Sequence, residues 1–87
     1  MEIKIKKESD KELEFEVIKE KTILNPLKQK LLEYDEVEYA EWKVAHPLIA
    51  NPEFYVRVKK GNVRDIIKKA IKELKGEIEE LLQQLEE

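Results

Sequence analysis

The sequence predicts an α+β fold in the order ββαββα, in which a four-stranded antiparallel sheet carries two helices on one face. Two observations predict this class. Apolar residues alternate with charged ones at strand spacing in four segments, and they recur every three or four residues in two others. A chain of 87 residues is long enough for one domain. We therefore expect residues 1–87 to form a single unit with its core between sheet and helices.

The N-terminal segment predicts an antiparallel hairpin. Apolar and charged residues alternate over residues 2–6 and again over residues 12–17. Residues 8–11 between them read Glu-Ser-Asp-Lys, a composition typical of a turn. Each strand should therefore have one apolar face and one charged face in contact with water.

The period changes near residue 22, where apolar residues begin to recur at helical spacing. They form one stripe: Ile23, Leu24, Leu27, Leu31, Leu32 and Tyr34. Either Thr22 or Asn25 could cap this helix. Pro26 suits the first turn, because backbone N–H groups there have no partner within the helix and proline lacks this group. We predict an irregular first turn from Thr22 and a regular helix from Pro26 to residue 33 or 34.

Two further strands follow the first helix. The apolar phase shifts within residues 37–44, which predicts a bulge near residues 39 and 40. Residues 54–58 alternate again and end before Gly61, which breaks the fourth strand.

His46, Pro47 and Leu48 are predicted to form a structural corner between these strands. Pro47 cannot donate to a ladder and holds His46 in extended geometry. A catalytic histidine would need a group that orients or activates it, and the chain has no second histidine. The same lack disfavours a pterin-processing dehydratase, which relies on several histidines.

The last element is predicted to be a long helix from a cap at Asn62 to about Leu85. Asp65 stands three residues after Asn62, in an approximate capping box. Such a helix is roughly 35 Å long, whereas strands of five to eight residues span roughly 17–25 Å. Its last turns must therefore overhang the sheet.

The two helices carry more apolar residues than one sheet-facing stripe needs. These residues can be core, but their excess favours a partner interface, because exposed apolar stripes of this size mark partners. The predicted interface comprises Ile23, Leu24, Leu27, Leu31, Leu74, Ile78, Leu81, Leu82 and Leu85.

Composition argues against several classes of function. With no cysteine and one histidine, neither a disulfide nor a structural zinc site is expected. The 20 acidic and 17 basic residues give a net charge of −3, whereas nucleic-acid binding needs a clustered basic face. No glycine-rich phosphate loop or nucleophile motif is present, so no cofactor or catalytic residue is predicted. No apolar run spans a bilayer and no signal sequence opens the chain, so the cytoplasm is the expected compartment.

Two other patterns have both a functional and a structural interpretation. Glu12, Glu14 and Glu16 share a strand face and could do acid–base work, but exposed glutamates chiefly provide solubility. Residues 54–58 faintly resemble an RNA-binding strand, yet the neighbouring hairpin is acidic rather than basic. The structural interpretation is favoured for both.

Several segments spread over nearly the whole chain share the pattern of one known family. They are residues 1–5, 13–16, 22–28, 40–48 and 54–61. The densest is residues 40–48, which end in His-Pro-Leu, and residues 22–25 contribute a Thr-x-x-Asn helix start. Together they resemble the subunit L family, the small alpha-like subunits of archaeal RNA polymerase.

The departures from this family lie at the start of the first helix. Glu20-Lys21 replace an Asp-His pair, Leu24 replaces a glycine, and Pro26 stands where a leucine is usual. In the family this helix packs against the partner, so the changes bear on the interface.

The resemblance implies a noncatalytic role. Members form a heterodimer with the larger alpha-like subunit of the polymerase, and the pair supports assembly of the catalytic subunits. The alternative is a free-standing or engineered homodimeric interaction module of the same fold.

Overall fold

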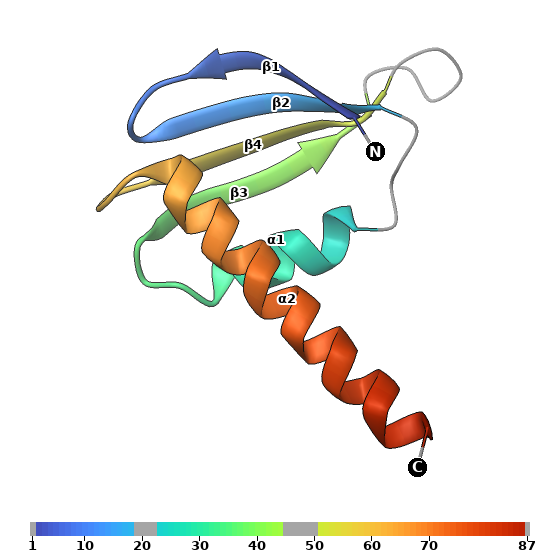
Figure 1. Ribbon diagram of the computed structural model, residues 1–87. Coiled ribbons are helices and arrows are strands. Elements are labelled where there is room, and N and C mark those ends of the chain that lie inside the picture. Colours follow the sequence, from blue (N-terminus) through green and yellow to red (C-terminus); the bar gives the residue numbers. More distant parts are fainter. Residues whose placement is uncertain (1, 19–22, 45–50, 87) are drawn as a thin grey trace.

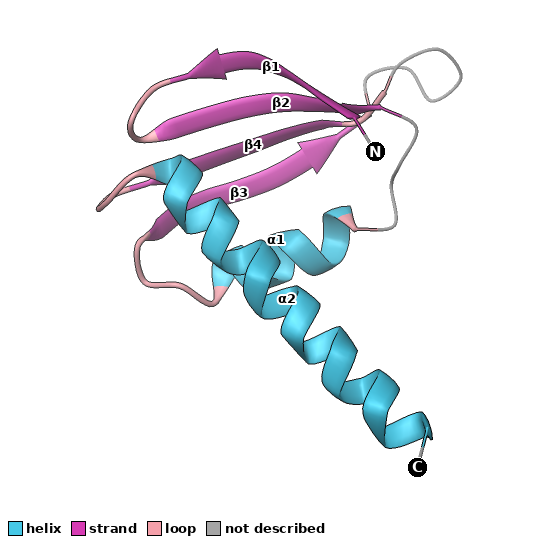
Figure 2. Ribbon diagram, in the orientation of Figure 1, coloured by secondary structure: helices cyan, strands magenta, loops and turns pink. Residues whose placement is uncertain are grey.

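The computed structural model describes residues 2–18, 23–44 and 51–86 and confirms the predicted order of elements (Figure 1). The elements are β1 (Glu2–Glu8), β2 (Glu12–Ile18), α1 (Leu24–Leu32), β3 (Val37–Lys43), β4 (Glu53–Val58) and α2 (Val63–Glu86). Four strands form one curved sheet, and α2 runs away from it toward the C-terminus (Figure 2).

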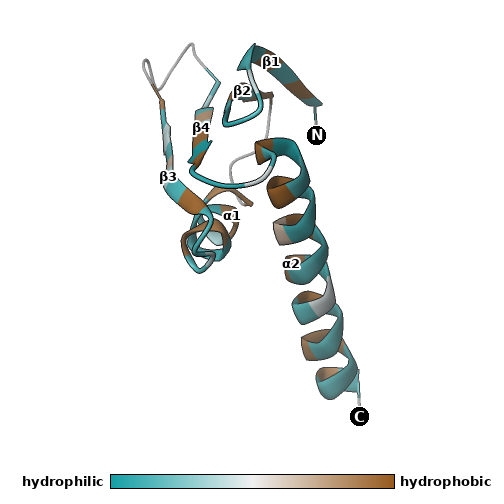
Figure 3. Cartoon of the chain, turned by 90° about the vertical axis from the view of Figure 1, so that its left-hand side faces the viewer, coloured by the Kyte–Doolittle hydropathy of each residue, from teal (hydrophilic) through white to brown (hydrophobic). Residues whose placement is uncertain are grey.

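The sheet has the strand order β1-β2-β4-β3, with every neighbouring pair antiparallel. Both helices lie on the same side of it (Figure 3). The predicted bulge in the third strand is present slightly earlier than expected, as a register shift between Val37 and Tyr39. A second shift in β1 lies between Ile5 and Lys7. β1 and β3 are therefore the edges, and β2 and β4 form the centre.

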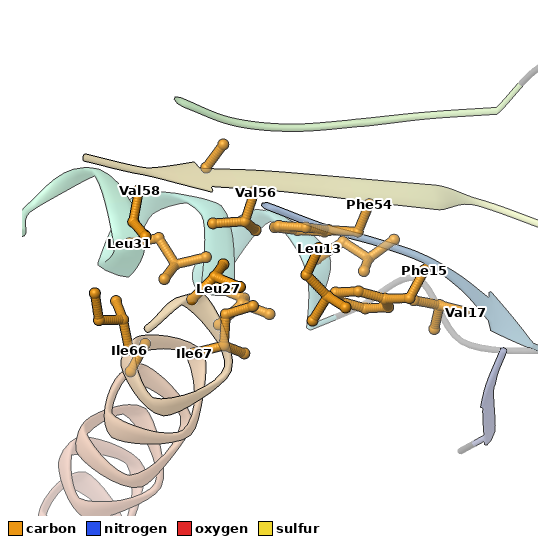
Figure 4. Close-up of a cluster of buried hydrophobic side chains, with 14 residues drawn as sticks. Leu13, Phe15, Val17, Leu27, Leu31, Phe54, Val56, Val58, Ile66 and Ile67 are labelled. Atoms are coloured by element: carbon orange, nitrogen blue, oxygen red, sulfur yellow. The ribbon is translucent and has the colours of Figure 1, made fainter. Parts of the chain in front are cut away.

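The core lies between the central strands and the two helices (Figure 4). Phe15 and Phe54 stack there with ring centroids 5.5 Å apart and planes tilted by 14°. The buried apolar side chains are Leu13, Phe15, Val17, Leu24, Leu27, Leu31, Ala40, Phe54, Val56, Val58, Val63, Ile66, Ile67 and Ala70. Every α2 residue in this set belongs to the first eight positions of the helix, so only its beginning packs on the sheet.

The helix starts agree with the predictions only in part. The Asn62 side chain accepts a hydrogen bond from the Asp65 backbone N–H at 3.2 Å, which confirms the predicted cap of α2. α1 begins at Leu24 and ends at Leu32, so both predicted bounds shift slightly. Asn25 is not its cap, because its side-chain oxygen instead accepts from the Trp42 indole N–H at 2.9 Å. Thr22 lies outside the described residues.

The two glycines should respond oppositely to alanine. Gly61 has φ of +74°, a backbone conformation that is strained for alanine. The added Cβ would meet only Ile66 Cδ1, at 3.5 Å, so the space itself is sufficient. We expect Gly61→Ala to lower the free energy of unfolding by about 1 kcal/mol. A Cβ on Gly76 meets nothing within 4 Å. Gly76→Ala should stabilise the helix by about 1 kcal/mol. Urea unfolding of both variants measures these changes. Two changes of the same sign would contradict the prediction that the glycines respond oppositely.

Candidate dimerisation surface

Beyond Ala70 the α2 helix carries a row of apolar residues (Figure 3). We call this row the overhang stripe: Ile71, Leu74, Ile78, Leu81, Leu82 and Leu85. Most of their side chains are exposed, and Leu74 alone is partly buried and packs against the core. The spacing of three and four residues places these side chains along one side of the helix. Ile78, Leu81 and Leu85 are 63%, 57% and 77% exposed. The predicted overhang is thus present, with its apolar side chains in water.

An apolar groove continues the overhang stripe onto the sheet. It lies between β1 and α2, and its volume is about 240 Å³. Its walls include Ile3, Ile5, Ile23 and Ile71, and its floor is formed by core residues such as Phe15. Ile3 and Ile5 are 53% and 41% exposed, so the groove leaves this edge of the sheet partly open. The strand pattern places both isoleucines on the helix-facing side of the sheet, but it does not reveal that this edge is uncovered.

Three of the residues predicted at the interface belong to the chain's own core. Leu24, Leu27 and Leu31 are 1%, 4% and 0% exposed, so that part of the prediction is corrected. The α1 helix is short and has only one apolar stripe. That stripe faces the sheet and forms part of the core of the chain. Leu24 and Leu27 also form part of the groove floor. The half-buried Ile23 and the predicted α2 residues remain candidates for partner contact.

A buried lysine joins α1 to α2 where the overhang begins. The Lys30 ammonium forms a short ion pair with Glu77 and longer ones with Glu33, at 3.6 Å, and Glu73, at 3.9 Å. Its side chain is buried, whereas the three carboxylates are largely exposed. Because Glu73 and Glu77 stand on successive turns of α2, Lys30 helps to fix the direction in which the overhang leaves the sheet.

Stability at alkaline pH should depend on Lys30. The hydrogen bond to Glu77, opposed in part by desolvation, raises the pKa of Lys30 above its ordinary value. A raised lysine pKa gives stability that is complete below the unfolded value of about 10.4 and is lost as pH rises through the folded value. We therefore expect the unfolding temperature of the wild type to fall relative to Lys30→Met above about pH 10.4. Circular dichroism melts of both proteins from neutral pH upward measure their unfolding temperatures. If the two unfolding temperatures changed in parallel with pH, the prediction would be contradicted.

The described residues form neither a metal-ligand cluster nor a membrane-spanning helix. Within residues 2–18, 23–44 and 51–86, no three histidine, cysteine, aspartate or glutamate side chains are grouped so as to hold a metal ion. No helix in that part of the chain is both long and apolar enough to cross a membrane. The predicted corner of His46, Pro47 and Leu48 lies outside the described residues.

The family model of the RNA polymerase Rpb3/Rpb11 dimerisation domain matches residues 12–84 of the chain. The match includes β2, β3, β4, both helices and most of the overhang stripe. The name of this family refers to dimerisation rather than catalysis, in agreement with the predicted noncatalytic role.

Archaeal polymerase subunits are similar over most of the chain. The DNA-directed RNA polymerase subunit Rpo11 of Methanococcoides burtonii is 35% identical over 83 residues, which cover 94% of this chain and 91% of that protein. The Methanocella arvoryzae Rpo11 is 39% identical over 84 residues, with coverages of 94% and 90%. The Thermoplasma acidophilum Rpo11 is 40% identical over 60 residues. This match covers 69% of the chain and about half, 54%, of that relative.

A solved structure shows the same fold. The crystal structure of DNA-directed RNA polymerase subunit L from Thermoplasma acidophilum matches with a TM-score of 0.87 and 31% sequence identity, over 98% of this chain and 85% of that one. Subunit L and Rpo11 are equivalent names, so the resemblance found in the sequence is confirmed. The chain belongs to the RNA polymerase Rpb3/Rpb11 dimerisation-domain family.

Proposed function

We propose that the chain is a noncatalytic assembly subunit of a DNA-directed RNA polymerase, which forms a heterodimer with the larger alpha-like subunit and so supports transcription in the cytoplasm. The observation that carries the proposal is the overhang stripe, which continues into the groove beside β1. A partner helix or sheet edge laid along both would cover this surface. Family membership supplies the class of partner, because the family model is that of a dimerisation domain.

The energetics of pairing require both parts of this surface. Burial of one large apolar side chain contributes about 1.5–3 kcal/mol. Association costs at least about 4 kcal/mol in lost motion, before side chains are ordered. Two or three exposed leucines on the overhang would therefore give weak pairing. Ile3 and Ile5, which are 53% and 41% exposed, add apolar side chains to the overhang stripe, so burial of both parts is expected to give tighter pairing.

Charge around the overhang stripe supports a partner with basic side chains at its edge. Beyond Gly76 the chain carries five glutamates and no lysine or arginine, and Glu86 lies in the last turn of α2. An anion there faces the negative end of the helix dipole, which is unfavourable in the isolated chain. Lysine or arginine side chains of a partner would neutralise these carboxylates and help to orient the two subunits.

Co-expression with the larger alpha-like subunit, followed by size-exclusion chromatography, tests the proposal. We expect the two chains to elute together as a complex containing one copy of each. Separate elution of two folded proteins would overturn the proposal. Elution of this chain as a homodimer that the partner does not dissociate would favour the homodimeric alternative instead.

A further inference from the structure

The edge of the overhang stripe nearest the β1 groove carries charged side chains whose sign changes along α2. We call them the charged row: Lys68, Lys72, Lys75, Glu79 and Glu86. Their spacing places them along one side of the helix, and all five are exposed. Lys68 lines the groove, whereas Glu86 lies in the last turn of α2, far from the sheet (Figure 1). The row therefore runs from a positive end at the groove to a negative end.

The opposite edge of the overhang stripe faces α1. Glu73 and Glu77 lie on this edge, and both pair with the Lys30 ammonium of α1. Behind them, the Lys69 ammonium lies 5.0 Å from the centroid of the Tyr34 ring. The chain thus uses the charges of this edge to hold its own two helices together.

The charged row has no such use within the chain. No ion pair joins its lysines to a described carboxylate or its glutamates to a described cation. Lys68 and Lys72 stand one turn apart, where like charges repel. Glu86 faces the negative end of the helix dipole, which is unfavourable. Since the row does not stabilise the isolated chain, its charges remain available to a partner.

The two signs of the row are too far apart to cancel. At a rise of about 1.5 Å per residue, Lys72 and Glu86 lie roughly 21 Å apart along the helix axis. Salt screens charges beyond about 8 Å at physiological ionic strength. Only Lys75 and Glu79, which stand one turn apart where the sign changes, are near enough to offset each other. A partner on the overhang stripe therefore meets positive charge at the groove and negative charge at the C-terminal end.

The spacing of the overhang stripe suits a helix as the covering segment. Steps of three and four residues alternate strictly through Ile71, Leu74, Ile78, Leu81 and Leu85. This is the heptad spacing of a seam between two helices, in which the residues flanking the seam contact flanking residues of the other helix. The charged row occupies such a flanking position.

We infer that the charged row fixes the direction of a partner helix laid along the overhang stripe. The inference rests on the proposed function, because the helix belongs to the larger alpha-like subunit. Acidic side chains of that helix lie beside Lys68 and Lys72, and basic ones lie beside Glu79 and Glu86. The reverse direction brings like charges together and is disfavoured.

An exchange variant tests this inference: Lys68→Glu, Lys72→Glu, Glu79→Lys and Glu86→Lys, which together leave the net charge unchanged. Isothermal titration calorimetry with the purified larger alpha-like subunit measures pairing. We expect the dissociation constant to rise about tenfold for either half of the exchange and about a hundredfold for the whole. The effect should shrink at high salt. The unfolding midpoint should not fall, because none of the four side chains belongs to the core.

The matched control is Lys59→Glu with Lys60→Glu, two exposed residues in the loop between β4 and α2. It changes the net charge as much as the lysine half of the exchange does, and it should leave the dissociation constant unchanged. An equal loss of affinity in this control would show attraction by net charge alone and overturn the inference. A loss confined to the glutamate half would also overturn it, because the partner edge would then be basic throughout.

The calorimetry separates this inference from the proposed function. Equally tight pairing of the wild type and the exchange variant would overturn the inference alone and leave the heterodimer intact. A folded wild type that does not bind the larger subunit, or that stays paired with a second copy of itself in its presence, would overturn both.

Discussion

The double substitution Ile78→Glu with Leu81→Glu is expected to abolish pairing with the larger alpha-like subunit. Both side chains belong to the overhang stripe, so the change places two carboxylates in the proposed interface. Loss of two central contacts of about 2 kcal/mol each would raise the dissociation constant roughly 1,000-fold. Isothermal titration calorimetry of purified chain and partner measures this constant. The chain itself should keep its fold, because neither side chain contributes to the core.

Gln83→Glu is the control for this pair of substitutions. It adds a carboxylate to the same exposed stretch of α2 but outside the overhang stripe. Pairing should persist in this variant. If the double variant bound as tightly as the wild type, the overhang stripe would not be the partner surface.

Phe54→Ala is expected to give the largest loss of stability from a single change. Phe54 is fully buried in the central strand β4 and stacks on Phe15 of the neighbouring strand. Truncation of a buried phenylalanine costs about 3–5 kcal/mol, which is a large share of the 5–15 kcal/mol typical of a whole domain. Urea denaturation followed by circular dichroism measures the loss.

The control for the core substitution lies on the other face of the same sheet. Tyr39→Ala removes an aromatic ring of similar size from a position that is half exposed. Its effect on the unfolding midpoint should be much smaller than that of Phe54→Ala. Equal effects would mean that the core does not lie on the helix-covered side.

Local chemistry made much of this fold predictable. Alternation identified all four strands, and the change to a helical period identified both helices. The Asn62 cap needs only an acceptor side chain three residues before a free backbone N–H, so the sequence suffices to find it. The overhang followed from comparing a helix length with a strand length.

Contacts between distant segments could not be predicted in the same way. Periodicity indicates which side chains share a face, but it does not indicate what covers that face. Leu31 is therefore predicted at the interface although it belongs to the core, and the alternation over residues 2–6 does not indicate that Ile3 lines an open groove. The ion pair of Lys30 with Glu77 joins residues 47 positions apart. Such pairs depend on how the helices cross, which no local pattern specifies.

The most direct test of the dimerisation surface is methyl NMR of isoleucine-labelled chain upon addition of the unlabelled larger alpha-like subunit. The methyl signals of Ile3, Ile5, Ile71 and Ile78 should shift together, because these side chains line the groove and the overhang. Ile18 follows the inward-facing Val17 and so points to the opposite face, where its signal should change little. A shift of Ile18 with unchanged signals from Ile71 and Ile78 would place the partner on the outer face and contradict the account.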